Sequence, residues 1–311
     1  MALRECTSSD YPKLVEFWNL NAGWDVINEE LWKERFLSSP IGNSFVVIVE
    51  NDGNIQAQLI FVSLSVSLGK EVFFGSRPYA AVIAKRSTGL SGYKYIIQLY
   101  NFGIQLLKKK KFDLVIMLPD PRWKRLASFF DIHIFSFPLF KLSLSTDMKF
   151  DDAVYEISPI DFDDNRIDLL WDEISNQNNY MISRDGQNLK WKNSHRDYKI
   201  VGVLEGETLI GVATYLEKAK ENQIQICDLL FKAGFGESVI KEISNYLFSM
   251  YGSMDQFQKI VCLATDSLKI LLSQAGYEYG DYDFYFGVKL LNPSIPNQVL
   301  KSPNWYVSAN D

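Results

Sequence analysis

The stretch that decides the fold is Val82-Ile83-Ala84-Lys85-Arg86-Ser87-Thr88-Gly89-Leu90-Ser91-Gly92. Before the loop, Glu71–Ile83 has the apolar-rich pattern of a strand. After it, we expect a helix that extends to about Lys110, because apolar residues recur there at helical spacing and bury one face. The stretch therefore predicts a strand, a glycine-containing loop and a long helix in succession.

A loop of this composition at a helix start can bind a phosphate. Its backbone N–H groups point at one place, and the helix dipole adds partial positive charge. The residues that could contribute close backbone approach, hydroxyl donors or positive charge are Lys85, Arg86, Ser87, Thr88, Gly89, Ser91 and Gly92. A plain tight turn between strand and helix is the alternative.

The rest of the first half predicts a mixed α/β unit. Asp52-Gly53 between two strand-like runs predicts a hairpin. The other elements expected in this half are a strand near Ala2–Cys6, helices at Tyr11–Asn21 and Glu29–Leu37, a buried strand at Phe112–Leu118, a helix near Arg122–Phe130, and two closing strands up to Leu144.

The second half repeats this plan. Hairpin glycines Gly53 and Gly206 are 153 residues apart, and the glycines before the long helices, Gly89 and Gly234, are 145 apart. Near-constant offsets indicate that one fold has been duplicated. We therefore predict two domains, 1–147 and 152–311, each a mixed, mostly antiparallel sheet flanked by helices, in the α/β (α+β) class.

The order of elements and the strand–loop–helix stretch resemble the GNAT superfamily of acyltransferases. More narrowly, the chain is similar to bacterial tandem GNAT proteins associated with polysaccharide or cell-surface biosynthesis. Three features carry that likeness: Arg184–Lys192, Asp228-Leu229-Leu230, and Trp305 followed by Asp311. The resemblance implies an N-acyltransferase that moves an acetyl or other acyl group from coenzyme A to a primary amine, on an amino sugar or an amino acid.

The two halves differ at the expected phosphate loop. In the second half, Lys232–Gly236 is shorter and has one basic residue. We therefore expect the first half to bind acyl-CoA and the second to contribute to the acceptor pocket or to support it. The opposite assignment stays open, because Gly234 and Gly236 could also hold a phosphate.

Acid–base chemistry has three candidates in this sequence. Amine acylation needs a proton acceptor, and a tyrosine can protonate the leaving thiolate. The candidates are Asp228 and Glu71 as bases and Tyr277 as acid, with structural roles as their alternatives. His195 could face an acceptor and Trp191 could stack on a sugar ring; a surface histidine and a core tryptophan are the plainer interpretations.

Composition narrows the possible partners. A net charge of −6 argues against nucleic acid, since phosphate neutralisation needs a basic surface. No apolar run approaches the ~20 residues that span a bilayer, and three scattered cysteines fit a reducing compartment. We expect a cytoplasmic protein without a metal. A non-catalytic GNAT-fold binding module and a carrier- or aminoacyl-dependent transferase are the alternative functions.

Overall fold

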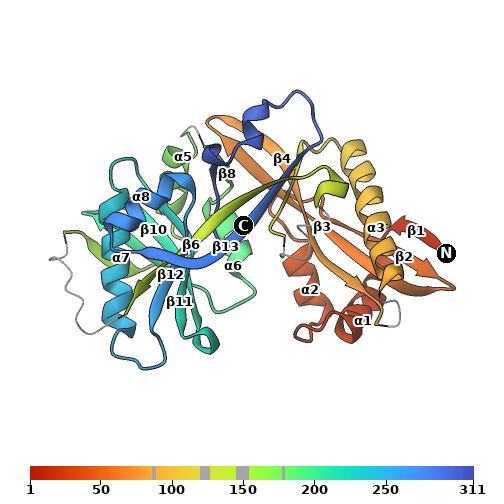
Figure 1. Ribbon diagram of the computed structural model, residues 1–311, viewed down its shortest axis with the longest axis horizontal. Coiled ribbons are helices and arrows are strands. Elements are labelled where there is room, and N and C mark those ends of the chain that lie inside the picture. The colour runs from red at the N-terminus through yellow and green to blue at the C-terminus, as the bar shows by residue number, and fades with distance from the viewer. Residues whose placement is uncertain (86–88, 120–126, 145–153, 177–178) are drawn as a thin grey trace.

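The computed structural model describes residues 1–85, 89–119, 127–144, 154–176 and 179–311. Two lobes lie side by side, one from each half of the chain (Figure 1). The first half contains β1 (Ala2–Glu5), α1 (Tyr11–Asn21), α2 (Glu29–Phe36), β2 (Phe45–Asn51), β3 (Asn54–Leu68), β4 (Glu71–Ile83), α3 (Leu90–Lys109), β5 (Leu114–Met117) and β6 (His133–Ser143). Within the described residues, none of the helices combines the length and apolar character that crossing a bilayer requires.

Helices cover both faces of the first-half sheet. Helices α1 and α2 bury Leu14, Trp18 and Trp32 against one face, where Ile48 and Ile60 point. The apolar side of α3 packs on the opposite face of β2 and β3. Alternation along the strands and the helical period of α3 together produce this three-layer arrangement.

The two hairpin turns lie where the sequence predicts them. Asp52 and Gly53 both have positive φ, 49° and 76°, and join β2 to β3. Gly206, with φ of 61°, joins β9 to β10. Glycine in such turns avoids the clash that a side chain would make at positive φ.

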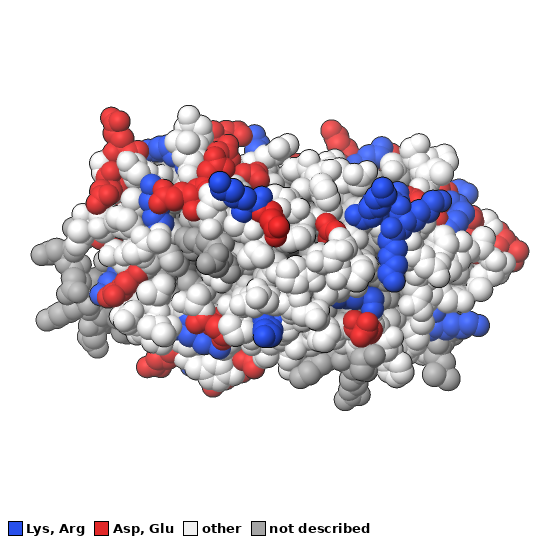
Figure 2. Space-filling view, turned by 90° about the horizontal axis from the view of Figure 1, so that it is seen from above, with Lys and Arg blue, Asp and Glu red and all other residues white. Residues whose placement is uncertain are grey.

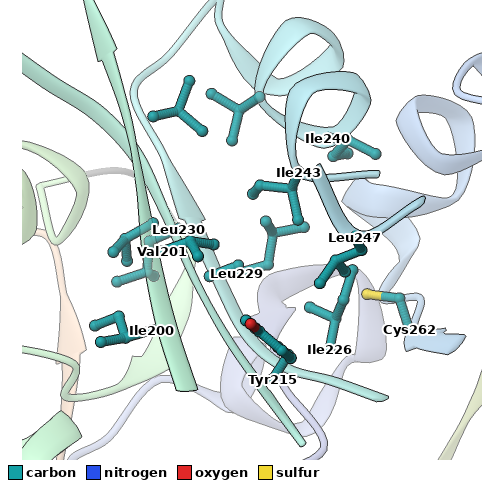
Figure 3. Packing of buried hydrophobic residues seen from close by; sticks show 14 of the residues in the cluster. Ile200, Val201, Tyr215, Ile226, Leu229, Leu230, Ile240, Ile243, Leu247 and Cys262 are labelled. Carbon is teal, nitrogen blue, oxygen red and sulfur yellow. The ribbon is translucent and has the colours of Figure 1, made fainter. Parts of the chain in front are cut away.

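The second half repeats the order of elements of the first half and adds further ones, among them β8 (Tyr180–Ile182) and β14 (Trp305–Tyr306). It contains β7 (Glu156–Pro159), α5 (Arg166–Ile174), β8 (Tyr180–Ile182), α6 (Gly186–Asn193), β9 (Lys199–Glu205), β10 (Thr208–Lys218), β11 (Gln223–Phe231), α7 (Gly236–Tyr251), β12 (Lys259–Leu263), α8 (Asp266–Gln274), β13 (Glu278–Leu290) and β14 (Trp305–Tyr306). Figure 3 shows its core, in which Ile243 and Leu247 of α7 face Ile226 and Leu229 of β11.

The halves share one sheet because they exchange their closing strands. The order is β1-β2-β3-β4-β5-β13-β6-β12-β11-β10-β9-β7, and most neighbours are antiparallel. Strand β13 of the second half lies beside β5, whereas β6 of the first half lies beside β12. The prediction of two closing strands before Leu144 is wrong: one strand, β6, covers that region, because it is long enough to pair with β12 and β13 along different stretches.

Matching backbone irregularities support the repeat. Strand β4 carries one extra residue opposite Gln58–Ile60, with Ala80 at φ of 54°. Strand β11 carries one extra residue, Cys227, at the corresponding place. Gly89 and Gly234, at φ of 75° and 85°, precede α3 and α7.

The sequence contained no signal for the path of the C-terminal segment. Strand β14 pairs with β8, and β8 also pairs with β3 of the first half. The end of the segment lies between the two lobes (Figure 1). Figure 2 shows Lys and Arg side chains interspersed with Asp and Glu over the face that it displays.

Candidate functional site

Parallel strands β4 and β5 diverge in the middle of the first-half sheet. They pair only at Gly75–Leu114 and Ser76–Val115. Beyond that point β4 pairs with β3 alone, and β5 pairs with β13. The bulge at Ala80 lies in the diverging part of β4. A bulge re-aims the backbone and side chains next to it.

The predicted phosphate loop connects this part of β4 to α3. Lys85 is exposed, and its N–H donates to Oδ1 of Asn21 at 3.0 Å. Gly89 is exposed and Gly92 is buried within α3, where Ser91 also lies. An added Cβ on Gly89 would meet no atom within 4 Å, so the loop has open space above it. The predicted contributors Arg86, Ser87 and Thr88 lie outside the described residues.

The corresponding divergence in the second half is filled. Strands β11 and β12 pair as far as Ile226–Cys262. Beyond it lies the C-terminal segment: Tyr306 donates a hydrogen bond to the carbonyl of Leu229, and Ser308 Oγ donates to Asp228 Oδ1 at 2.7 Å. The cavity that remains there is about 10 Å³. That space holds no more than a water molecule.

At the start of α7, Gly234 has open space as Gly89 does, whereas Gly236 is crowded. An added Cβ on Gly236 would come within 2.7 Å of Leu271 and 2.8 Å of Phe231. The one basic residue of this loop, Lys232, already pairs with Glu173 at 2.7 Å. This helix start therefore differs from that of α3 in the packing at Gly236 and in the pairing of its basic residue.

A cavity of about 210 Å³ lies between the two lobes. The first half contributes α2, β3 and β4, and the second contributes α6, the loop after it and the C-terminal segment. The side chains that matter for its chemistry are Arg35, Arg77, Tyr79, Trp191, Lys192, His195, Arg196, Tyr198 and Asp311. Tyr79 borders the divergence of β4 from β5, so the cavity and the diverging strands share a wall.

Guanidinium groups dominate one side of the cavity. Arg35 Nη2 donates to the hydroxyl of Tyr79 at 3.1 Å, and the Arg77 guanidinium lies 4.9 Å from the centre of the Tyr79 ring. Burial acts to raise the pKa of Tyr79, but Arg77 and Arg35 outweigh it and hold the pKa below its ordinary value. Burial itself lowers the pKa of Arg77. The two guanidiniums therefore stabilise the ionised form of Tyr79 relative to that of a free tyrosine.

Two further titratable groups, His195 and Tyr198, line the cavity. Burial, with the charges of Arg35 and Arg196, lowers the pKa of His195 to about 4, so its imidazole is neutral at pH 7. Burial raises the pKa of Tyr198 to about 12, and its hydroxyl donates to Asn310 at 3.3 Å. Trp191 donates its indole N–H to the carbonyl of Glu34 at 3.1 Å, which ties α6 to α2.

A buried ion-pair network adjoins the cavity, because two of its members, Lys192 and Asp311, also line the cavity wall. Arg184 Nε lies 3.0 Å from Asp228, and Arg184 also donates to Asp311. Lys192 Nζ lies 2.8 Å from Asp311 and 3.2 Å from Asp228. The side chains of Arg184, Asp228 and Asp311 are fully buried. Two positive and two negative charges balance, which is the condition under which charges are tolerated in a core.

None of the three predicted acid–base residues lines the cavity between the lobes. Glu71 is exposed at the start of β4. Asp228 belongs to the ion-pair network, where burial raises its pKa and Lys192 and Arg184 more than offset that effect. Tyr277 is buried with its hydroxyl 2.9 Å from Ser244, and burial raises its pKa. The wall of the cavity instead carries Tyr79, His195 and Tyr198, of which only His195 had been considered from the sequence.

Comparison with known proteins places the fold. No protein-family model matches the chain, and no curated protein matches it. Among solved structures, it is similar to a probable N-acyltransferase of Enterococcus faecalis V583, with a TM-score of 0.73 and 11% identity over 93% of this chain and 72% of that one. It is also similar to a GCN5-related N-acetyltransferase of Anabaena variabilis, with a TM-score of 0.69 and 12% identity over 94% and 73% of the two chains.

A further similar structure is organised as a tandem. It is a tandem GNAT protein from the clavulanic acid biosynthesis pathway, with a TM-score of 0.54 and 10% identity over 94% of this chain and 99% of that one. Identities this low carry the fold and not the chemistry. The chain has the tandem GNAT fold that its sequence predicts.

Proposed function

We propose that this tandem GNAT fold is an N-acyltransferase that moves an acyl group from coenzyme A to a primary amine of a small molecule. The donor binds to the first half, along the diverging part of β4 and at the start of α3. The amine binds in the cavity between the lobes. The second half closes that cavity and binds no donor of its own.

The chemistry of the loop fits a pyrophosphate. The first turn of a helix has N–H groups without intrahelical partners, and its dipole attracts an anion. Gly89 leaves open space at this helix start, and the exposed Lys85 adds positive charge. In the second half the matching glycine, Gly234, has the same open space, but the lysine of this loop, Lys232, is paired and Gly236 is crowded.

The transfer itself needs few groups from the protein. The neutral amine nitrogen forms a bond to the thioester carbonyl carbon, and the C–S bond then breaks as the tetrahedral adduct collapses. The amine loses one proton and the leaving thiolate gains one, so the products are an amide and free coenzyme A. Tyr79 is our candidate for carrying that proton, since neighbouring guanidiniums favour its ionised form.

The observation that carries this proposal is the shared wall. Tyr79 belongs both to the cavity and to the part of β4 that has left β5. An acceptor in the cavity and a thioester along β4 would therefore meet at this residue. Proximity of that kind is the main requirement for a bimolecular transfer.

Calorimetric titration of acetyl-CoA and free coenzyme A tests the donor site with a matched pair of variants. Gly89→Asp and Gly234→Asp each place an acidic side chain at a positive-φ glycine with open space around it. We expect one molecule bound per wild-type chain, affinity reduced at least roughly tenfold by Gly89→Asp, and affinity unchanged by Gly234→Asp. Thermal unfolding of both variants checks that each remains folded.

The other outcomes are equally informative. Loss of binding in Gly234→Asp alone would move the donor to the second half. No binding by the wild-type protein would contradict the use of coenzyme A and leave a carrier- or aminoacyl-dependent donor. Binding without transfer to any amine would leave a binding module.

We also propose that the protein works in the cytoplasm, because its three cysteines are free, as is usual in a reducing compartment.

A further inference from the structure

We infer that the cavity between the lobes selects an acceptor amine that also carries a compact anionic group, a carboxylate or a phosphate, held by Arg35, Arg77 and Arg196. This inference rests on the proposed function and names the substrate class of the same site. It follows from the charges on the cavity wall, from what those charges already bind, and from the size of the space.

The three guanidiniums converge from distant parts of the chain. Arg35 comes from α2, Arg77 from β4 and Arg196 from the loop after α6, and all three border the cavity. Each guanidinium has five N–H donors in a planar fork, a geometry that matches a carboxylate or a phosphate. An anion in this space would be attracted by all three of them.

The described part of the chain provides these guanidiniums with few acceptors. Arg35 donates to the hydroxyl of Tyr79, and Arg77 donates to the backbone carbonyl of Asp311. Among the described residues, no carboxylate forms an ion pair with Arg35, Arg77 or Arg196. Most of their N–H groups therefore remain available to a ligand.

The acidic residue on the wall does not neutralise them. The Asp311 carboxylate is engaged by Arg184 and by Lys192, whose Nζ lies 2.8 Å away. Asp228 balances the second charge of that network. The four charges of the network therefore sum to zero, and His195 is neutral at pH 7. Arg35, Arg77 and Arg196 then give the cavity a net positive charge.

Size and shape restrict the ligand further. About 210 Å³ is the size of a small polar molecule. Phe36, Val62 and Trp191 provide an apolar and aromatic wall for a carbon skeleton. The anion would lie against the arginines while the amine reaches Tyr79, where the acyl group is transferred.

Transfer from acetyl-CoA to matched amines tests the inference. One pair is glucosamine 6-phosphate and glucosamine, and the other is an L-amino acid and its carboxamide; in each pair the members differ by one anionic group. We expect kcat/KM to be at least roughly tenfold higher for the anionic member of one pair. The neutral member lacks a charged hydrogen bond to the arginines, and the loss of such a bond reduces affinity by about that factor. Which pair shows it distinguishes phosphate from carboxylate.

Variants connect the preference to the arginines. Arg196 is exposed, so Arg196→Glu reverses a charge without disturbing the core, and Arg35→Ala removes a second guanidinium. We expect each to reduce the preference for the anionic member about tenfold, with Arg35→Lys restoring part of it. Lys220→Glu, at an exposed position in the 3-10 turn Ala219–Glu221, makes the same charge change away from the cavity and is expected to keep the preference.

A binding measurement separates the inference from the proposed function. Inorganic phosphate is titrated into the wild-type protein, Arg196→Glu and Lys220→Glu without any acyl-CoA. Phosphate binding that Arg196→Glu weakens, with no transfer to any amine, would support the anion site and contradict the acyltransferase. Equal transfer to charged and neutral amines, with no phosphate binding, would overturn the anion site and leave the acyltransferase standing.

Discussion

The guanidinium of Arg184 lies 3.0 Å from the carboxylate of Asp228, and both side chains are fully buried. The two residues are 44 positions apart in the sequence, and Asp311 joins them from the C-terminal segment. They are also the residues on which the likeness to tandem GNAT proteins partly depends. Because Arg184 contacts Asp311 and Asp228 accepts from Ser308, these two residues hold the C-terminal segment beside the diverging strands β11 and β12.

We predict that Asp228→Asn destabilises the protein strongly. The substitution leaves Arg184 and Lys192 with one carboxylate between them in the core, a change that costs about 3–5 kcal/mol. Chemical denaturation measures the free energy of unfolding. The control is Asp163→Asn, which breaks the exposed pair between Asp163 and Lys190 and is expected to cost less than about 1 kcal/mol. Equal effects of the two substitutions would contradict the role of the network.

The free energy of unfolding is expected to decrease at acidic pH because His195 is held neutral in the folded protein. Its pKa in the folded protein is about 4, below the ordinary 6.5, so between these values the unfolded chain binds more protons. The contribution is complete above pH 6.5 and is lost as pH falls toward 4. We expect about 1–2 kcal/mol after allowing for solvent screening of this partly exposed group.

The unfolding free energy of His195→Gln across this pH range provides the check. The variant is expected to lose less stability than the wild type between pH 6.5 and 4. His133→Gln removes an exposed histidine of β6 and controls for the loss of an imidazole. Parallel pH curves for His195→Gln and the wild type would show that His195 is not held neutral in the fold.

Tyr79→Phe is expected to reduce kcat with little change in KM for the donor. Loss of a positioned proton carrier costs about 10²–10⁴-fold in rate. The limb of the pH–rate profile that reports the ionisation of Tyr79 should disappear. Tyr198→Phe is the comparison, because burial keeps the pKa of Tyr198 near 12 and its hydroxyl protonated. A larger loss in Tyr198→Phe than in Tyr79→Phe would transfer the role to Tyr198.

Separated halves are expected to fold poorly alone. In the intact chain β13 covers the edge of β5 and β6 covers the edge of β12. Residues 1–147 or 152–311 alone would expose one of these edges, and unpaired edges promote aggregation. Gel filtration of each half, and of the two expressed together, tests this. Two well-behaved monomers that do not associate would contradict it.

Much of the fold follows from short-range patterns. The Asp52-Gly53 turn needs positive φ at two adjacent residues, and few residue pairs other than such a dipeptide accept that. The apolar face of α3 repeats with helical period, so the helix and its buried side are legible in the sequence. The similar offsets of Gly53 from Gly206 and of Gly89 from Gly234 indicate the repeat, since a glycine recurs at the same turn and before the same helix.

The acid–base candidates show where such patterns stop. Asp228 stands between apolar residues, which predicts burial and a partner but does not say whether the partner is a core arginine or a ligand. From the sequence, Tyr79 is simply an aromatic residue within a predicted strand. Its neighbours Arg35 and Arg196 lie 44 and 117 positions away in the sequence. Nothing local distinguishes these arginines from other surface residues.

The sequence by itself determined the repeated plan of helices and strands, because turn conformation and amphipathic period depend on residues a few positions apart. It did not determine β8, α6, β14 or the single closing strand β6. Only the tertiary structure decided that the lobes exchange β6 and β13, that Tyr306 and Ser308 fill the second divergence, and that three arginines meet around one cavity. These features depend on strand register and on contacts between residues far apart in the sequence, such as Tyr306 and Leu229, which are 77 positions apart. Such contacts are selected by the packing of the whole chain, and no local pattern encodes them.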